Sequence, residues 1–249
     1  MRRYVFKMMY DGTEYHGFQV QNNAVTIQST IQDKLEIILG ERPPVKGCSR
    51  TDSGVHAFEY YFTADFEKNI STEKLVKALN FHLPKDIRIL SAAETNDDFH
   101  PRYSALWKEY KYFVWLSKVS NPFIERFSYF YPYNTDIERI IEYAPQIEGK
   151  RDFAAFMASG SSITDTVRNV MLCKAEYSDN LLTFTVRADG FLYNMVRIIV
   201  GTLLDGAAGK LKGNIDDIIE SRDRSRAGQT VPAKGLFLNK VYYGKELNL

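Results

Sequence analysis

The chain has 249 residues, enough for one large domain or two of ordinary size, and 45% of them are hydrophobic and 25% charged. Lysine and arginine number 32 against 31 aspartates and glutamates, so a net charge of +1 excludes a strongly basic tail that binds nucleic acid but leaves room for a local basic cleft. Two cysteines exclude a disulfide framework, and no apolar run is long enough to span a bilayer. Without a signal-peptide pattern or metal-ligand spacing, we expect a soluble, cytoplasmic protein that needs no metal.

The first part of the chain alternates strand-like and helix-like patterns. Apolar and β-branched runs predict strands at about residues 3–10, 57–66 and 87–93. Apolar residues at helical spacing predict a helix over about 27–39, with Thr26 as N-cap and Gly40 as the stop. A second, shorter helix is expected after Ser71. These elements indicate helices packed on a sheet.

The second part has the same style without repeating the sequence. Strands are expected at about residues 110–115, 170–177, 181–188 and 236–243, the middle two joined by a hairpin turn at 178–180. Helices are expected from a capping box of Thr135 and Glu138, over 191–204, and over 215–221 after Asn214. We therefore predict an α+β protein with an N-terminal domain over 1–105 and a C-terminal domain over 106–249.

Two charged residues are unusual in their surroundings. Arg197 lies within a helix pattern that is apolar on nearly every face, where an unpaired guanidinium would be costly. It is therefore either a structural ion pair or the partner of a functional carboxylate or phosphate. Asp52 lies in a loop of small and polar residues between Arg50 and Gly54. Its spacing alone favours an Asx turn over a catalytic nucleophile.

Five blocks in order resemble the TruA family of tRNA pseudouridine synthases. Residues 50–57, Arg-Thr-Asp-Ser-Gly-Val-His-Ala, are similar to the family's Arg-Thr-Asp-Ala-Gly-Val-His-Ala signature. The other four are residues 10–19, residues 98–105 with the Tyr-Lys-Tyr at 110–112, residues 191–202 and residues 232–236. Together they run along nearly the whole chain, and such an ordered set is far more specific than a lone Arg-Thr-Asp.

The resemblance implies a function for several residues. It makes Asp52 the catalytic carboxylate, Arg197 its partner, Tyr110 the aromatic side chain that stacks on the target base, and Arg50 a residue that opens space for the flipped nucleotide. Leu236 resembles a residue that lines the uracil pocket, and packing in the core is the alternative role. The family fold has two RRM-like (ferredoxin-like) halves, with antiparallel sheets and helices on one face, around a central RNA-binding cleft. The implied reaction is isomerisation of uridine at positions 38–40 of the tRNA anticodon stem-loop, without a cofactor, in a homodimer.

Positive residues cluster near the matched blocks and are candidates for RNA contact. They are Arg102, Lys108, Lys111, Arg222, Arg224, Arg226 and Lys234. Each is equally well explained as a solvated surface charge. The sequence departs from the family pattern at Ser49, Ser53, Phe18, Pro101 and the Lys108-Glu109 pair, where two basic residues are typical. These departures leave the catalytic set intact, and they concern residues expected to contact the RNA.

Alternative functions remain open at this point. The same chemistry could act on another structured RNA such as ribosomal RNA, or the fold could serve a non-catalytic RNA-binding protein. An aspartate-nucleophile phosphoesterase is a further possibility, but it would need a group of several acids that the sequence lacks.

Overall fold

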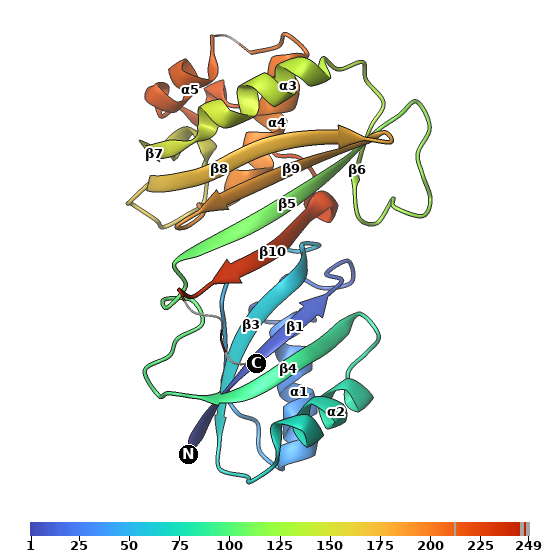
Figure 1. Cartoon of the computed structure of the whole chain (residues 1–249), viewed down its shortest axis with the longest axis vertical. Coiled ribbons are helices and arrows are strands. Elements are labelled where there is room, and N and C mark those ends of the chain that lie inside the picture. The colour runs from blue at the N-terminus through green and yellow to red at the C-terminus, as the bar shows by residue number, and fades with distance from the viewer. Residues whose placement is uncertain (212, 245–246, 248–249) are drawn as a thin grey trace. The chain divides into compact units, whose positions relative to one another are not determined.

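The computed structural model describes residues 1–211, 213–244 and 247, and it contains two compact units. The first comprises Met1–Leu106 together with Phe237–Leu249, and the second comprises Trp107–Leu236. The chain is therefore not divided at a single point, because its last strand belongs largely to the first unit (Figure 1). Each unit combines helices with a mainly antiparallel sheet, which confirms the α+β class.

The first unit has the order strand, helix, strand, strand, helix, strand. Its elements are β1 (Arg2–Tyr10), α1 (Ile27–Leu39), β2 (Val45–Gly47), β3 (His56–Phe66), α2 (Thr72–His82) and β4 (Ile87–Thr95). The strands lie in the order β4-β1-β3, with β2 on the other edge of β3, and all these pairs are antiparallel. The last strand, β10 (Leu236–Tyr242), pairs in parallel with the start of β3. This order of elements is the ferredoxin-like arrangement that the resemblance implied.

Aromatic pairs between β1 and β3 form the core of this sheet. Phe6 lies opposite Phe62 in the strand register, and their rings stack with centroids 4.6 Å apart. Tyr4 and Phe66 stack in the same way at 4.3 Å. Cross-strand aromatic pairs of this kind stabilise a sheet beyond the area they bury, so they fix the register of β3 and with it the point where β3 begins.

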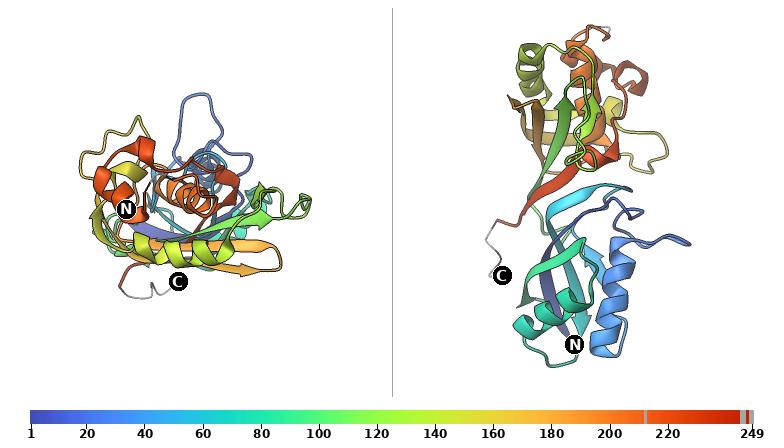
Figure 2. Two further views of the ribbon diagram at one scale, coloured as in Figure 1. Left: turned by 90° about the horizontal axis from the view of Figure 1, so that it is seen from above. Right: turned by 90° about the vertical axis from the view of Figure 1, so that its right-hand side faces the viewer.

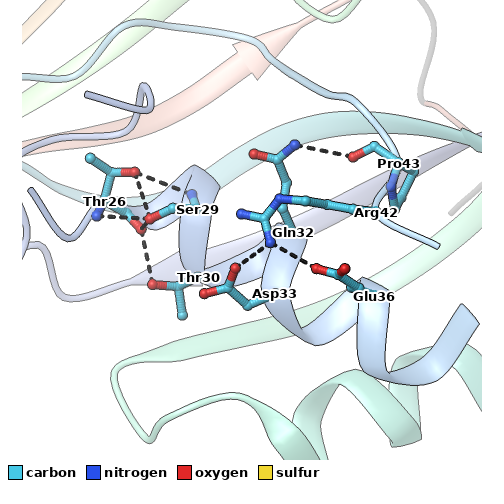
Figure 3. Close-up of polar contacts among 8 residues, drawn as sticks. All are labelled: Thr26, Ser29, Thr30, Gln32, Asp33, Glu36, Arg42 and Pro43. Carbon is cyan, nitrogen blue, oxygen red and sulfur yellow. Dashed lines mark hydrogen bonds and ion pairs between the residues drawn. The ribbon is translucent and has the colours of Figure 1, made fainter. Parts of the chain in front are cut away.

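Local signals define both ends of α1, as the sequence predicted. The Thr26 hydroxyl accepts a hydrogen bond from the backbone N–H of Ser29 at 3.1 Å, and the Ser29 hydroxyl accepts one from the N–H of Thr26 at 3.1 Å (Figure 3). This reciprocal pair is a capping box. At the other end Gly40 has φ +84°, the left-handed conformation that ends many helices.

Side chains of α1 also hold the segment that leads into β2. The Gln32 side-chain amide donates to the carbonyl oxygen of Pro43 at 3.1 Å, and Arg42 reaches back to Asp33 and Glu36 (Figure 3). The Gln28 amide donates to the carbonyl oxygen of Val45 at 2.7 Å. Figure 2 shows α1, in mid-blue, along one side of the strands of this unit. The helix thus fixes the chain just before the Asp52 loop begins.

The second unit is built around four strands. Its elements are β5 (Trp107–Leu116), β6 (Tyr129–Tyr131), α3 (Ile137–Tyr143), β7 (Gly149–Asp152), β8 (Val167–Ser178), β9 (Leu181–Ala188), α4 (Met195–Ala207) and α5 (Ile215–Ser221). The sheet order is β7-β8-β9-β5, all antiparallel, with the short β6 parallel to β5. The hairpin between β8 and β9 turns where expected, and both Asp179 and Asn180 have positive φ, at 52° and 64°. Such values are those of a type I′ turn.

Two predicted helix starts in this unit are wrong. Asp136, not Thr135, is the N-cap of α3, because its carboxylate accepts the N–H of Arg139 at 3.0 Å. The helix predicted from residue 191 begins only at Met195, since Asn194 has φ 60° and ψ 12° in the left-handed region. The N-cap at Asn214 is confirmed, with a reciprocal capping box to Asp217.

Candidate active site

The Asp52 loop, residues 48–55, connects β2 to β3 and is attached to β3 at its start. The N–H of Cys48 donates to the carbonyl oxygen of Tyr61 at 2.9 Å. The Tyr60 hydroxyl donates to the carbonyl oxygen of Ser49 and accepts its N–H at 3.4 Å. The loop therefore leaves the sheet in a fixed direction, because β3 itself is held by the aromatic pairs of the core.

The other side of the Asp52 loop rests on residues 12–18. The N–H of Phe18 donates to the carbonyl oxygen of Thr51 at 3.2 Å, and the N–H of Gly54 donates to that of Tyr15, also at 3.2 Å. Gly17 has φ +85°, and a Cβ added there would overlap the Thr51 carbonyl oxygen. Only glycine combines this conformation with this close approach. Two sequence blocks that are far apart in the chain thus form one structure.

Asp52 itself is half-buried at the turn of this loop. Its carbonyl oxygen accepts the N–H of Val55 at 3.2 Å, and Gly54 completes the turn with φ +75°. The Ser53 hydroxyl donates to the carbonyl oxygen of Tyr15 at 3.2 Å. Arg50 is exposed on the same loop. The backbone that carries the Asp52 carboxyl group is therefore held on both sides of the residue.

A buried histidine secures the point where the loop joins β3. Nδ1 of His56 lies 3.0 Å from the backbone N of Gly12, which donates to it, and 3.1 Å from a carboxylate oxygen of Asp11. The His56 ring stacks on Phe237 of β10 at 4.5 Å. His56 was not among the predicted site residues, and its place in the signature block at residues 50–57 is the signal that could have identified it.

Tyr110 lies on β5 in the second unit, opposite Val186 of β9. Its ring meets that of Phe191 edge-on, with centroids 4.9 Å apart and planes at 84°, and its exposed fraction is 6%. Side chains on a strand alternate between faces, so Lys108 shares the face of Tyr110 whereas Lys111 lies on the other. Of the two candidate lysines on this strand, only Lys108 is on the same face as the aromatic ring.

Arg197 lies in the first turn of α4, and its guanidinium is fixed by backbone and side-chain acceptors. Nε donates to the carbonyl oxygen of Val231 at 2.7 Å, and a terminal nitrogen donates to the Asn194 side-chain oxygen, also at 2.7 Å. Asn194 is the residue in left-handed conformation that delays the start of α4. A non-glycine residue in that region carries strain and is frequent at functional sites. The backbone irregularity therefore coincides with the positioning of Arg197.

Leu236 follows a single turn of 3₁₀ helix that packs against β5. The Tyr112 hydroxyl donates to the carbonyl oxygen of Pro232 at 2.6 Å, and Gly235 lies so close to the Tyr112 ring that no side chain would fit there. Leu236 is buried, with an exposed fraction of 7%. Burial raises the pKa of Tyr112, so its hydroxyl stays protonated as a donor. Within this unit, residues 231 and 232 are thus bonded both to Arg197 at the start of α4 and to Tyr112 of β5.

The acidic residue beside Tyr110 is neutralised. Glu109 is largely buried, and its carboxylate accepts two hydrogen bonds from the Arg187 guanidinium, at 2.6 and 3.0 Å. The same guanidinium lies 4.5 Å from the centre of the Trp107 ring. Glu109 therefore forms a structural ion pair on the face opposite Tyr110.

The remaining basic candidates differ in their surroundings. Arg224 donates to the carbonyl oxygens of Ala227 and Gly228, at 3.3 and 2.9 Å, and to the Thr230 hydroxyl at 3.1 Å. Burial lowers its pKa. Two others form ion pairs, Arg222 with Asp152 at 3.0 Å and Lys234 with Glu125. Arg226 is exposed, and Arg102 lies beside the exposed ring of Tyr103. Among these basic candidates, Arg224 thus supports the loop at residues 227–230.

Neither a metal site nor a membrane span is found in the part of the chain that the structure describes. No group of three or more His, Cys, Asp or Glu side chains there could hold a metal ion. No helix among the described residues is long and apolar enough to cross a bilayer. Cys48 and Cys173 are both buried thiols without a disulfide.

The sequence matches the family model described as tRNA pseudouridine synthase over residues 8–104 and 144–244. A curated relative from Thermoanaerobacter sp. (strain X514), named tRNA pseudouridine synthase A, is 44% identical over 98% of this chain and the whole of its own length. Relatives of the same name from Acetivibrio thermocellus and Clostridium acetobutylicum are both 42% identical, over 98% of this chain and 100% of theirs. The crystal structure of a Cbf5-Nop10-Gar1 complex matches with a TM-score of 0.38 at 12% identity, over 94% of this chain and 57% of that one, too distant a likeness to support a conclusion.

The chain belongs to the tRNA pseudouridine synthase family, whose members are isomerases. The resemblance found in the sequence blocks is thereby confirmed.

Proposed function

We propose that this chain converts uridine to pseudouridine in the anticodon stem-loop of tRNA, at positions 38–40, with Asp52 as the catalytic carboxylate. The observation that carries this proposal is the Asp52 loop, which is held from both sides in a chain matched along its whole length by tRNA pseudouridine synthases. The reaction requires an oriented nucleophile or base, and a rigid backbone orients the carboxylate that it carries.

The reaction breaks the N-glycosidic bond of uridine, turns the detached uracil and joins its C5 to C1′ of the ribose. Uridine and pseudouridine are isomers, so the C5 proton lost at the end equals the proton gained at N1. A uracil within a stem must first leave the base stack, which costs a few kcal/mol. The protein therefore has to hold a flipped nucleotide as well as supply a reacting group.

Asp52 must be ionised whether it acts as a nucleophile or as a general base. As a nucleophile its carboxylate attacks the ribose or the base, and as a general base it removes a ribose proton. The contacts of Thr51, Gly54 and Val55 restrict the backbone around it. This restriction supports the assignment, because the carboxyl group then approaches the nucleotide with little conformational entropy left to lose.

The other proposed site residues hold the substrate. The Tyr110 ring stacks on the target base, which recovers about 1–3 kcal/mol of the cost of flipping. Arg197 supplies positive charge for the Asp52 carboxylate, and the bonds to Val231 and Asn194 support this role because they hold the guanidinium still. Leu236 lines the uracil pocket, and Arg50 opens space for the nucleotide.

We further propose that Arg102, Lys108, Lys111, Arg222, Arg226 and Lys234 form the basic surface for the RNA phosphates, whereas Arg224, the seventh candidate, supports a loop. An A-form stem displays mainly phosphates and 2′-hydroxyl groups, so such a surface reads shape rather than sequence. Arg222 and Lys234 also form ion pairs, with Asp152 and Glu125. The protein acts in the cytoplasm as a homodimer, an assignment that rests on the family resemblance and is tested by light scattering on the purified chain.

The test uses tRNA transcripts with uridine or cytidine at positions 38, 39 and 40. After incubation with the purified chain, pseudouridine is mapped by carbodiimide labelling and primer extension. The expected result is modification at these uridines alone, full loss with Asp52→Asn, and retained RNA binding by that variant. Asp165→Asn is the control, because Asp165 is an exposed carboxylate in another loop, where it accepts the backbone N–H of Val167.

Two results would contradict the proposal. Modification at other tRNA positions, or only in ribosomal RNA, removes the stem-loop assignment. Normal turnover by Asp52→Asn removes the carboxylate from the reaction.

A further inference from the structure

The loop that follows β4 presents an aromatic ring to solvent. Tyr103 has an exposed fraction of 75%, one of the highest of any large apolar side chain described. A ring of this size loses favourable burial when it stays in water. Its exposure is notable because the loop around it is not loose.

Hydrogen bonds close this loop at several points. Nδ1 of His100 accepts the backbone N–H groups of Arg102 and Tyr103, at 3.1 and 3.4 Å. The Ser104 hydroxyl accepts the N–H of His100 at 3.1 Å, and the N–H of Ser104 donates to the His100 carbonyl oxygen at 2.9 Å. The Pro101 carbonyl oxygen accepts the hydroxyl of Tyr243 at 2.9 Å. The backbone beneath Tyr103 is therefore fixed.

The ring itself is supported on two sides. The His100 ring lies 4.5 Å from it, with planes at 40°, and the Arg102 guanidinium lies 5.7 Å from its centre. We call His100, Arg102 and Tyr103 the Tyr103 platform. A supported ring has lost much of its motion already, so a ligand that stacks on it meets a smaller entropic cost.

Positive charge surrounds the platform. The pKa of His100 is lowered by burial first, and then by the charges of Lys46, Arg102 and Arg3. Arg3 is neutralised by an ion pair with Asp65 at 2.7 Å. Lys46 acts on the Asp65 carboxylate as well, so Arg102, beside the Tyr103 ring, is the basic side chain that this site presents to a ligand. The occupant that suits such a surface is anionic and carries a flat aromatic group.

We propose that the Tyr103 platform stacks an unpaired base of the RNA substrate, a nucleotide other than the uridine that reacts. An exposed aromatic ring beside basic side chains is the usual arrangement for binding single-stranded nucleic acid. Bases inside a duplex have no free face, so the occupant must lie in a loop or a bulge. The inference rests on the proposed function for the identity of the RNA. It adds a second point of contact with that RNA, separate from the base that reacts.

Exposure alone does not define such a site, and a second exposed ring provides the control. Phe81 on α2 is 84% exposed and contacts a histidine ring, His82, at 5.1 Å. Among the described residues no cation lies over its ring. Phe81→Ala therefore removes an exposed ring of similar size that also lies beside a histidine, but without a cation over the ring.

The first test measures binding of a tRNA transcript by fluorescence anisotropy at several salt concentrations. Tyr103→Ala is expected to weaken binding by about 5- to 100-fold, the range for one lost base stack, with an unchanged salt slope. Tyr103→Phe is expected to bind within about two-fold of the original chain, since it keeps a stacking face, and Phe81→Ala to bind unchanged. Arg102→Gln is expected to reduce the salt slope by about 1.

The second test locates the base. The fluorescent base 2-aminopurine is placed at each unpaired position of the tRNA in turn. Quenching on binding is expected at one position with the original chain and not with Tyr103→Ala. Unchanged affinity of Tyr103→Ala overturns the inference, and so does full binding by Tyr103→Leu, which has no aromatic face. Both readouts are of binding, so they remain valid if the chain modifies another RNA position, whereas absent pseudouridine with intact stacking would count against the proposed function only.

Discussion

The hydroxyl groups of Tyr10 and Thr51 lie 2.8 Å apart in a buried position, one residue before Asp52. Tyr10 ends β1, and Thr51 belongs to the Asp52 loop. The bond connects the end of β1 directly to the side chain of the residue that precedes the proposed catalytic Asp52. A buried hydroxyl that loses its partner keeps its desolvation cost, so each group depends on the other.

Tyr10→Phe tests whether this connection positions Asp52. We expect kcat for pseudouridine formation to fall several-fold while KM for tRNA stays the same, because the loop loses its anchor and the RNA surface does not. The free energy of unfolding should fall by about 1 kcal/mol. Steady-state kinetics and urea denaturation of the same preparation measure both.

Two variants separate positioning from stability. Tyr4→Phe removes another β1 hydroxyl, which donates to Glu94 at 3.2 Å far along the strand from the loop, and should leave kcat unchanged. Thr51→Ser keeps the hydroxyl and should keep most of the activity. If Tyr10→Phe and Tyr4→Phe lower kcat equally, the bond has no positioning role.

The close approach of Gly17 to Thr51 supports a second prediction. In Gly17→Ala the new methyl group overlaps the Thr51 carbonyl oxygen, and the residue keeps an unfavourable positive φ. The segment around residue 17 and the Asp52 loop must therefore move apart. We expect a loss of more than about 2 kcal/mol in unfolding free energy, above the usual cost of about 1 kcal/mol for alanine in this conformation. Gly40→Ala is the matched control, since φ is +84° there and no atom lies within reach of the new methyl. Equal losses in the two variants would show that conformation alone decides the cost.

The sequence predicted what local chemistry determines. Thr26 and Gly40 bound α1 because a hydroxyl cap and a left-handed glycine act within a few residues. The hairpin at 178–180 has the same local origin. Asp52, Tyr110 and Arg197 were found by their motifs, and their roles remain proposals.

The sequence could not predict what depends on distant contacts. The parallel pairing of β10 with β3 joins residues about 180 positions apart, and no local pattern encodes it. The bond between Tyr10 and Thr51 is of the same kind. The start of α4 was misplaced because the apolar pattern continues through Asn194. There the backbone is in the left-handed region, and the Asn194 side chain accepts a hydrogen bond from Arg197. Helical periodicity reports which face is buried and not where the hydrogen bonds begin.

Arg224 should behave as a structural residue rather than as an RNA contact. Its three hydrogen bonds hold residues 227–230, next to the segment that receives Arg197 at Val231. Arg224→Gln is expected to lower the unfolding free energy by about 1–3 kcal/mol, with little change in the salt dependence of RNA binding. Arg226→Gln is the comparison: stability within about 0.5 kcal/mol of the original chain and a salt slope reduced by about 1. Thermal unfolding and salt titrations decide between the two patterns, and the opposite pattern would exchange the roles of these arginines.

His100 gives the first unit a pH-dependent stability. Burial, followed by the positive charge of Lys46, lowers the pKa of His100 below its ordinary 6.5 in the folded chain. Its neutral Nδ1 accepts two backbone N–H groups, and protonation would remove that acceptor. The stabilisation is therefore complete above pH 6.5 and declines as the pH falls through the folded pKa, because the unfolded chain takes up the proton first. His100→Asn offers a neutral acceptor that does not titrate. Urea denaturation between pH 8 and pH 5 should show the original chain losing stability relative to His100→Asn below pH 6.5, and a constant difference across that range would remove His100 as the cause.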